Sequence, residues 1–451
     1  MKTANIRVKP HNSTQKNKHN SFFGKIIEKK EGWIHLEVGG TPYEIGFAHG
    51  KLLRPHFAQV LKVLPYNVAN ELTIPYADYL RDCKRLFSPI LELPEWSFIK
   101  EELRGIVAGA STKGITYDFL IAWNSFLSMC SYYQKNHGRC SAFIATGSAT
   151  KTGEIVMAHN THSDFATGFL LNVVMHVYPS NNPSNSPIAF IMQTAPGLIC
   201  SSSDWFLCEN GIIGCETTIS NLNYTPEFSK DFVPYYLRIR KAMQYGKTLD
   251  DYVEIMSNRS AGDYACTWFL GNVNTGEIMM LENGHKHTGV QRTRDGIFHA
   301  SNDAMTPEIA ALETTSVEKY NPDSTTGARY LRMEHLLFDK YRGKLDTHLA
   351  KKIMADHYDV SESKYKMGKM SICKHRELDY GGKDGKDGKD VWKYMKGATD
   401  GKVIDSAMAK KMQFEGRMGS CCGRIFRRAD YNLSKDVPIL NMPRHKWIKF
   451  V

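Results

Sequence analysis

The sequence lacks the features that mark membrane-spanning, exported or disulfide-bonded proteins. It has no window of about 18 apolar residues, so no membrane-spanning helix is expected. Residues 1–12 contain no apolar signal core, which argues against export by a conventional signal peptide and favours a cytoplasmic location. The ten cysteines are scattered without a Cys-x-x-Cys pair, which favours reduced thiols over a disulfide framework or a structural zinc site.

The charge pattern does not favour nucleic-acid binding. The formal net charge is +11, and a charge of this size can indicate a polyanionic partner. Much of the positive excess lies in residues 1–30 and 364–411, and no basic run is interleaved with aromatic residues. No specific nucleic-acid partner is therefore expected.

The first 139 residues have mainly helical patterns. Residues 1–22 are polar and basic and predict a mobile arm, and Trp33–Val38 alternates as a strand does. The run Thr41-Pro42-Tyr43-Glu44 predicts a capping box that opens a helix to about residue 64. Gly46 and Gly50 in this helix indicate either a close helix contact or a tolerated pair. Further helices are expected over 71–111 and 116–130.

At Cys140 the spacing of apolar residues changes from a helical pattern to one typical of strands. The expected strands are 141–146, 154–159, 169–178, 188–194, 204–208, 212–218, 265–271 and 277–281. The expected helices are 235–246, 249–258, 328–341 and 347–357. The Gly-Lys-Asp run at 381–390 predicts a surface loop, and the remainder to Val451 predicts irregular structure and short helices. Helices, then strands, then helices indicate the packed layers of an α+β protein.

Cys140 is the candidate nucleophile. It opens a predicted hairpin whose second strand returns His159, Asn160 and His162 toward it. The alternative is that Cys140 packs as a small apolar side chain, as free cysteines often do. His159 and His162 have a spacing that suits two metal ligands, but no third ligand pattern lies nearby, so neither a metal nor a cofactor is expected.

A nucleophilic cysteine needs a base, because a free thiol has a pKa of about 8.5. A histidine is the usual partner. If the Arg139–Cys140 bond were cut, the new α-amino group of Cys140, with a pKa of about 7.7 to 8.0, would itself be a suitable base.

These residues resemble the N-terminal nucleophile hydrolases. Within that superfamily the chain is most similar to the branch of the acyl-coenzyme A:6-aminopenicillanic acid acyltransferases (peptidase family C45), the phospholipase B-like proteins and, more distantly, the choloylglycine hydrolases. The resemblance covers about residues 35–345. It includes Cys140-Ser141-Ala142 and the hairpin ending in Ala158-His159-Asn160-Thr161. It implies that Cys140 is a nucleophile exposed by self-cleavage and that His159 and its neighbour Asn160 belong to the active site. His162 stands where other branches have aspartate or tryptophan, and its role stays open.

Three later segments carry the rest of the resemblance. Glu209–Thr218 is similar to the strand that bears an oxyanion-hole residue, here Thr218; without the resemblance it would be a β-branched strand end. Asn302 matches the asparagine that donates to the oxyanion. In Thr325–Arg332, Arg329 matches an arginine close to the nucleophile, where it would favour the thiolate.

The resemblance implies a four-layer αββα sandwich with antiparallel sheets. Residues 1–139 would comprise the mobile arm and a helical pro-segment or small chain, and residues 140–451 the catalytic core with a C-terminal extension. The implied enzyme is a hydrolase or acyltransferase that acts on an amide or ester bond of an acylated small molecule or lipid through a thioester. Related precursors commonly have glycine or serine before the nucleophile, whereas this chain has Arg139.

Other functions stay open beside this one. They are a phospholipase B-like lipid deacylase, a catalytically inactive relative that kept the fold as a binding protein, and a basic nucleic-acid-binding protein. The oligomeric state is left open by the sequence.

Overall fold

The computed structural model describes residues 24–135, 140–180, 186–223, 226–229, 231–379, 395–431 and 433–451. The expectations for the arm at 1–22, for Arg139 and for the Gly-Lys-Asp run at 381–390 lie outside these residues.

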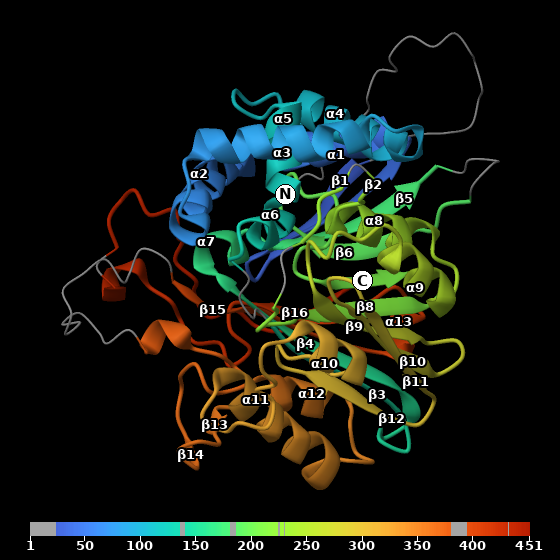
Figure 1. The fold of residues 1–451 in the computed structure, drawn as a ribbon, viewed down its shortest axis with the longest axis vertical. Helices are drawn as coiled ribbons and strands as arrows, with labels where there is room; N and C mark the ends of the chain where they lie inside the picture. Colours follow the sequence, from blue (N-terminus) through green and yellow to red (C-terminus); the bar gives the residue numbers. More distant parts are fainter. Residues whose placement is uncertain are drawn as a thin grey trace.

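Two β-sheets form the centre of the molecule (Figure 1). The strands of the nine-stranded sheet are, in spatial order, β1 (Gly24–Lys30), β2 (Trp33–Gly40), β5 (Val173–Pro179), β6 (Phe190–Thr194), β7 (Trp205–Cys208), β8 (Ile212–Thr218), β9 (Cys266–Asn272), β10 (Glu277–Asn283) and β11 (Thr288–Thr293). Those of the six-stranded sheet are β12 (Gly296–Ala300), β3 (Cys140–Gly147), β4 (Gly153–Asp164), β15 (Lys396–Asp405), β16 (Phe414–Met418) and β17 (Ile448–Phe450). The short strands β13 (Tyr358–Asp359) and β14 (Lys364–Tyr365) pair separately.

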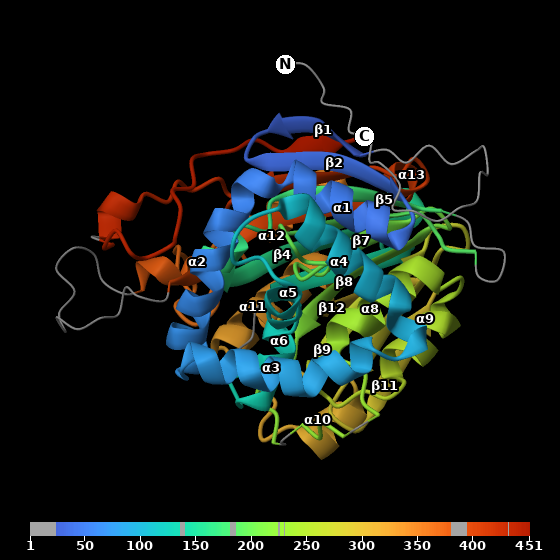
Figure 2. The same cartoon turned by 90° about the horizontal axis from the view of Figure 1, so that it is seen from above.

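Helices cover both outer faces of the paired sheets (Figures 1 and 2). The α-helices are α1 (Pro42–Leu52), α2 (Phe57–Asn67), α3 (Tyr76–Leu91), α4 (Ser97–Ala110), α5 (Tyr117–Asn124), α6 (Phe126–Tyr132), α7 (Phe165–Gly168), α8 (Tyr235–Tyr245), α9 (Leu249–Ser257), α10 (Pro307–Glu313), α11 (Thr325–Glu334), α12 (Thr347–Met354) and α13 (Ser406–Ala409). Helices α1, α8 and α9 pack on the larger sheet, and α11 and α12 pack on the smaller one. The chain therefore has the expected α+β class and the four layers of an αββα sandwich.

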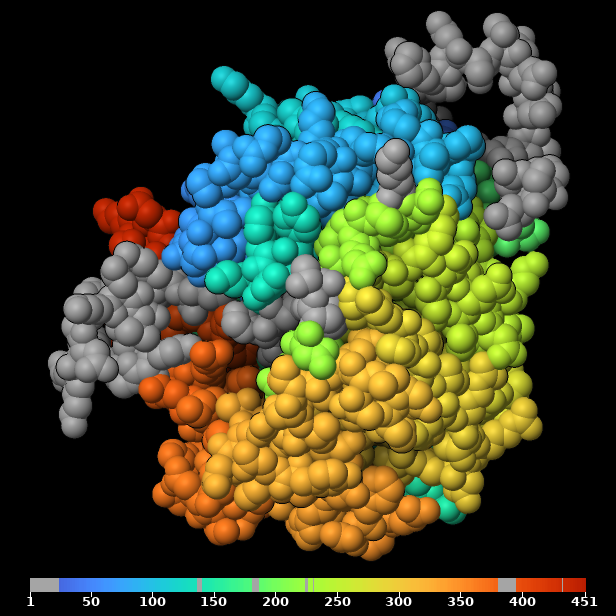
Figure 3. All heavy atoms as spheres, in the orientation of Figure 1, coloured from blue at the N-terminus to red at the C-terminus, as the bar shows by residue number. Residues whose placement is uncertain are grey.

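Among the described strands of the two large sheets, neighbours pair antiparallel except β2 and β5, which are parallel. The N-terminal segment thus adds two strands to the larger sheet as well as a helical layer. The space-filling view shows its helices, in blue to cyan, at one end of the face, opposite the zone coloured yellow to orange (Figure 3).

Strand β3 is buried on both faces because it lies in an inner layer. Ala142 and Ile144 join the core that includes the sheet interface, and a Cβ on Gly271 of β9 would lie 3.0 Å from Cδ1 of Ile144. Phe143 and Ala145 point the other way and join a second core beneath α11 and α12. This alternation follows from the two-residue period of a strand.

Helices α1 and α4 cross at a very short distance. The predicted capping box at Thr41 and Glu44 is confirmed. A Cβ on Gly46 would lie 1.9 Å from the carbonyl oxygen of Glu102, and one on Gly50 would lie 2.3 Å from that of Ile106. The close helix contact is therefore the correct interpretation of this glycine pair.

Some expectations about secondary structure were wrong. The helix expected to run from the capping box to about residue 64 ends at Leu52, and a second helix begins at Phe57. The strand predicted from residue 169 begins at Val173, because Asp164 caps the short helix α7 just before it. The C-terminal part, expected to be irregular, supplies β15, β16 and β17, and β15 lies directly beside β4. The expected lack of a membrane-spanning helix agrees with the structure: among the residues described, every helix is too short or too polar to cross a bilayer.

Candidate active site around Cys140

Cys140 is the first residue of β3 and is 1% exposed. It pairs with Thr161 of β4, as the predicted hairpin requires. Burial raises the pKa of its thiol well above the ordinary value, and the carboxylates of Glu216 and Asp204 raise it further. A hydrogen bond from the backbone of His162 acts in the opposite direction but does not outweigh these effects. The thiol is therefore neutral at neutral pH, and a nucleophilic role requires a nearby base.

Arg329 joins the segments that surround Cys140. It lies in the first part of α11, whose N-cap is Ser324. Nη1 of Arg329 donates to the carbonyl oxygen of Cys140 at 2.9 Å and to Oγ of Ser141 at 2.7 Å. Nη2 donates to the carbonyl oxygen of Ser301 at 3.0 Å and to Oδ1 of Asn302 at 2.8 Å. Burial lowers the pKa of Arg329 to about 10, so the guanidinium keeps its charge at neutral pH.

Asn302 follows β12 and has a φ of +80°, in the left-handed region that asparagine tolerates better than most residues. Its amide orientation follows from its partners. Arginine has only donors, so Oδ1 of Asn302 must face Arg329. Nδ2 is thereby turned to the other side, where it donates to the carbonyl oxygen of Thr218 at 2.9 Å. The structure thus brings Asn302, Arg329 and Thr218 into one network with Cys140.

The hydroxyl of Thr218 belongs to a chain of buried hydrogen bonds. Its Oγ1 lies 2.8 Å from the hydroxyl of Tyr264, which donates to Oε1 of Glu216 at 2.9 Å. When Glu216 is ionised, the hydroxyl of Tyr264 donates its hydrogen bond to the carboxylate, and the hydroxyl of Thr218 donates to that of Tyr264. The Thr218 hydroxyl is then an acceptor toward the site, and its expected donation to an oxyanion would need this chain to rearrange.

Two carboxylates beside Cys140 were not identified from the sequence. Sγ of Cys140 and carboxylate oxygens of Asp204 and Glu216 all lie within 4.8 Å of one another. The hydroxyl of Tyr235 donates to Asp204. Glu216 could have been noticed as an acidic residue inside the apolar strand β8, whereas Asp204, at φ +57° before β7, had no comparable signal.

The three candidate residues of the return strand β4 bond in two directions: His159 toward Glu216, and Asn160 and His162 toward Ile372. Nε2 of His159 contacts the carbonyl oxygen of Glu216 at 2.9 Å, and burial holds the pKa of His159 well below its ordinary value. Asn160 lies on the opposite face of the sheet, where Nδ2 donates to the carbonyl oxygens of Met354 and Ile372. Among the described contacts, those of Asn160 therefore lead away from Cys140.

His162 lies beside the cysteine but bonds elsewhere. Its backbone interacts with Cys140, while its Nε2 contacts the carbonyl oxygen of Ile372 at 3.2 Å. Burial and the neighbouring cation Arg329 hold its pKa well below the ordinary value, so the ring is neutral at neutral pH.

A small pocket opens beside Cys140. It encloses about 40 Å³, room for a few water molecules. Its apolar wall comes from the ends of α5 and α6 and from two later loops, and its polar wall from β4 and Asp204. The apolar members are Trp123, Phe126, Leu127, Leu171 and Leu198.

Part of the chain matches a family of known proteins. A family model described as Phospholipase B matches residues 106–298, which include Cys140, His159 and Thr218. The resemblance to the phospholipase B-like branch is confirmed. The matched region ends before Asn302 and Arg329, which the fold adds to the site.

Two individual proteins are also similar to parts of this chain. An uncharacterized protein of the archaeon Archaeoglobus fulgidus is 23% identical over 256 residues, which are 53% of this chain. The match spans only 41% of that protein's length. The crystal structure of a variant of conjugated bile acid hydrolase from Clostridium perfringens aligns with a TM-score of 0.33 and 10% identity. That alignment covers 62% of this chain and 89% of the hydrolase.

Proposed function

We propose that this chain is a cysteine N-terminal nucleophile hydrolase that cleaves itself before Cys140 and then hydrolyses an amide or ester bond of an acylated small molecule or lipid. The observation that carries the proposal is the Arg329 network, which holds the backbone of Cys140 and the amide of Asn302 in one rigid unit. Residues 1–139 would be the small chain and residues 140–451 the catalytic chain.

The proposed base is the α-amine that the cut releases. The neutral His159 ring is bonded to the carbonyl oxygen of Glu216, which leaves it poorly placed for the thiol. The amine of Cys140 would take the thiol proton, and Sγ would attack the acyl carbonyl to form a tetrahedral oxyanion. The ammonium would protonate the leaving group as the thioester forms, and water would then release the acid. The carboxylates of Glu216 and Asp204, which lie within 4.8 Å of Sγ, would stabilise the positive charge that this amine carries between the two steps.

Asn302 is the proposed oxyanion donor. Arg329 fixes its Oδ1, so Nδ2 is oriented before the reaction begins. A preorganised donor of this kind stabilises charge that appears only in the transition state, and its removal costs about 10²- to 10³-fold in rate. The positive charge of Arg329 also favours the thiolate of Cys140.

The substrate is proposed to present an acyl group to the apolar wall of the pocket. Trp123, Phe126 and Leu127 from the N-terminal segment would contact it. Since about 40 Å³ is smaller than an acyl chain, the pocket must widen after the cut before Cys140. A phospholipase B-like lipid deacylase is the second candidate, and the family match over residues 106–298 favours it.

The test is the intact mass of purified protein, followed by a substrate panel. Wild type is expected to give fragments 1–139 and 140–451, and Cys140→Ala a single chain without activity. Cys83→Ala, a buried cysteine of α3, is the matched control and should be cleaved like wild type. The panel contains N-acyl amino acids, lysophospholipids and acyl thioesters, and the first two classes separate amidase from lipid deacylase activity.

A wild-type chain that stays whole and does not react with acylating thiol probes would refute the nucleophile. That result would favour the inactive binding protein.

A further inference from the structure

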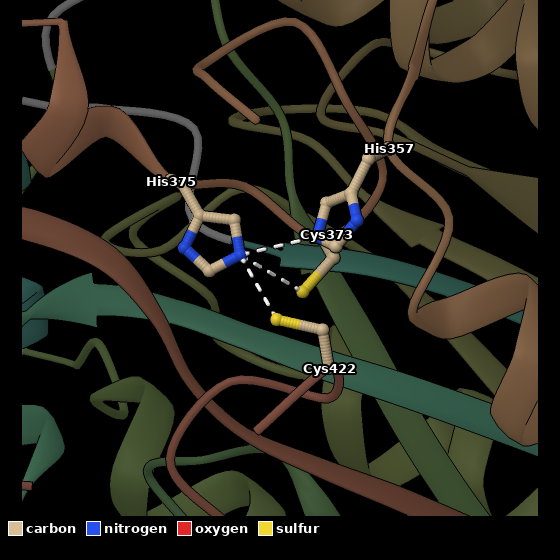
Figure 4. A group of neighbouring side chains, drawn as sticks. All are labelled: His357, Cys373, His375 and Cys422. Carbon is tan, nitrogen blue, oxygen red and sulfur yellow. Dashed lines mark hydrogen bonds between the residues drawn. The ribbon is translucent and has the colours of Figure 1, made fainter. Parts of the chain in front are cut away.

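Four metal-binding side chains converge on one point outside the Cys140 site. They are His357, which follows α12; Cys373 and His375 from the next loop; and Cys422 from the turn after β16. Their Nε2 and Sγ atoms all lie within 4.8 Å of one another. Figure 4 shows the two imidazoles and the two sulfurs turned toward one another, with three contacts meeting at Nε2 of His375.

The distances agree with those around a tetrahedral metal ion. Zinc bonds of about 2.3 Å to sulfur and about 2.0–2.1 Å to nitrogen place two nitrogens about 3.3 Å apart and a sulfur about 3.5 Å from a nitrogen. In this cluster Nε2 of His375 lies 3.2 Å from Nε2 of His357. The same atom lies 3.5 Å from Sγ of Cys373 and 3.3 Å from Sγ of Cys422.

The surroundings of His375 prepare it as a ligand. Nδ1 of His375 lies 2.9 Å from Oε1 of Glu377. A carboxylate can only accept, so Nδ1 donates to Glu377, and Nε2 is the nitrogen that faces the cluster. A histidine bonded to a carboxylate through its other nitrogen is the usual arrangement around protein-bound zinc.

The burial pattern also suits a bound ion. His375 and Cys373 are 1% and 0% exposed, while His357 and Cys422 are half-buried and leave a path from solvent. Two thiolates and two neutral imidazoles balance the charge of a divalent cation, so the occupied site would be electrically neutral. Binding would displace the protons that these ligand atoms carry without the metal.

We propose that His357, Cys373, His375 and Cys422 form a structural Zn²⁺ site. A closed set of two cysteines and two histidines is typical of structural zinc and leaves no position for a substrate. The missing Cys-x-x-Cys pair hid this site in the sequence, because its ligands come from three separate segments.

The site joins two C-terminal loops, those of Cys373 and Cys422, and both loops contact the same face of β4. Ile372, next to the ligand Cys373, accepts hydrogen bonds at its carbonyl oxygen from Asn160 and His162. On the other side, Cys421, next to the ligand Cys422, donates to Oδ1 of Asn160 at 2.6 Å. Zinc would thus stabilise β4, the strand beside Cys140, through contacts on the face of β4 that points away from the reacting atoms.

Metal analysis of the full chain, purified without chelators or a histidine tag, tests the proposal. Wild type is expected to contain about one zinc per chain, and X-ray absorption at the zinc edge should show two sulfur and two nitrogen ligands. The double variant Cys373→Ser/Cys422→Ser should lose the metal. Cys421→Ser makes the same change in the same turn outside the ligand set, and it should keep the metal.

A milder variant covers the case in which the double variant does not fold. Glu377→Gln leaves all four ligands in place, and its zinc dissociation constant, measured against a chromophoric chelator, should rise about 10- to 100-fold. Cys140→Ala should retain zinc, which separates this proposal from the proposed enzymatic function.

Three outcomes would overturn the site. They are a wild-type chain that takes up no zinc when Zn²⁺ alone is added, zinc that persists in the double variant, and a Cys373–Cys422 disulfide in peptide maps of non-reduced protein.

Discussion

At the scale of single residues, Arg329 determines the geometry of the candidate site. Its two terminal nitrogens donate four hydrogen bonds to two other segments of the chain, and Arg329 is 1% exposed. Lysine keeps the charge but cannot reproduce a planar fork. With lysine at this position, some of the four buried acceptors would therefore be left without a hydrogen-bond donor.

We expect Arg329→Lys to lower kcat/KM by about 10²- to 10³-fold, because the amide of Asn302 would no longer be oriented. The free energy of unfolding should fall by about 2–4 kcal/mol, since hydrogen bonds to a buried charge are lost. Steady-state kinetics and urea unfolding measure the two effects.

Arg332→Lys is the control, because Arg332 lies one turn further along α11 and pairs with Asp356 instead. Equal losses of activity in both variants would contradict a specific role for Arg329.

The sequence predicted the residues of the site that lie in recognisable motifs. Cys140 opens a strand, Asn302 follows one, and Arg329 lies in the first part of a helix, and the structure brings the three together. Asp204 and Glu216 could not be predicted, because only the folded sheet places their carboxylates beside a cysteine far away in the chain. The orientation of Asn160 depends on the strand's register, which a motif does not contain.

At the scale of elements, the crossing of α1 and α4 depends on glycine. We expect Gly46→Ala to destabilise the protein by about 1–3 kcal/mol, because the new Cβ would lie 1.9 Å from a backbone oxygen that cannot rotate away. This cost exceeds the gain of about 0.5–1 kcal/mol that alanine brings to a helix. The midpoint of urea unfolding measures the change.

Lys51→Ala, on the exposed side of α1, should change stability by less than about 0.5 kcal/mol. A neutral or stabilising Gly46→Ala would show that the helices separate at little cost.

The parallel junction of β2 and β5 is expected to weaken in acid. Nε2 of His35 and Nε2 of His176 lie 2.8 Å apart, and burial lowers the pKa of His35 to about 4 and that of His176 to about 3. Below pH of about 6.5 the unfolded chain binds protons that the folded chain does not, so stability falls by up to about 1.4 kcal/mol per pH unit for each ring. Denaturant titrations between about pH 7 and pH 5 measure this slope.

His176→Gln should reduce that slope by one ring's contribution, while the exposed His348→Gln should leave it unchanged. Identical slopes in all three proteins would contradict the assignment.

Strand β15 could not be predicted from the periodicity of apolar residues. The segment Lys396–Asp405 is rich in glycine and charge, which is typical of a loop. In the fold, Asp400 and Lys402 are fully buried and pair with each other at 2.8 Å, so the strand can occupy the sheet interior. The pairing of two buried charges offsets the cost of their burial, and it depends on the tertiary surroundings, which a local sequence pattern does not contain.

At the scale of the whole molecule, the segments before and after Cys140 are interlocked. Seven residue pairs join β2 to β5, and Trp33 packs against Phe450 with ring centroids 5.4 Å apart. The ends of α5 and α6 also line the pocket beside Cys140. The segment before the proposed cut therefore shares its sheet and its hydrophobic core with the segment that follows the cut.

We expect the cleaved protein to remain one particle. Fragments 1–139 and 140–451 should separate on a denaturing gel but elute together in native size-exclusion chromatography, because pulling them apart would expose the core around Trp33. Addition of urea should separate them. Elution of the small fragment by itself in native buffer would contradict this interlocking.

The position of β15 also bears on when activation takes place during synthesis. Nζ of Lys402 bonds Oγ1 of Thr161, the partner of Cys140, from 241 positions further along the chain. A nascent polypeptide emerges from the ribosome in order, so Cys140 leaves the exit tunnel long before the strand that completes its surroundings. Self-cleavage would then follow the emergence of β15, and a chain stalled before β15 would stay uncut.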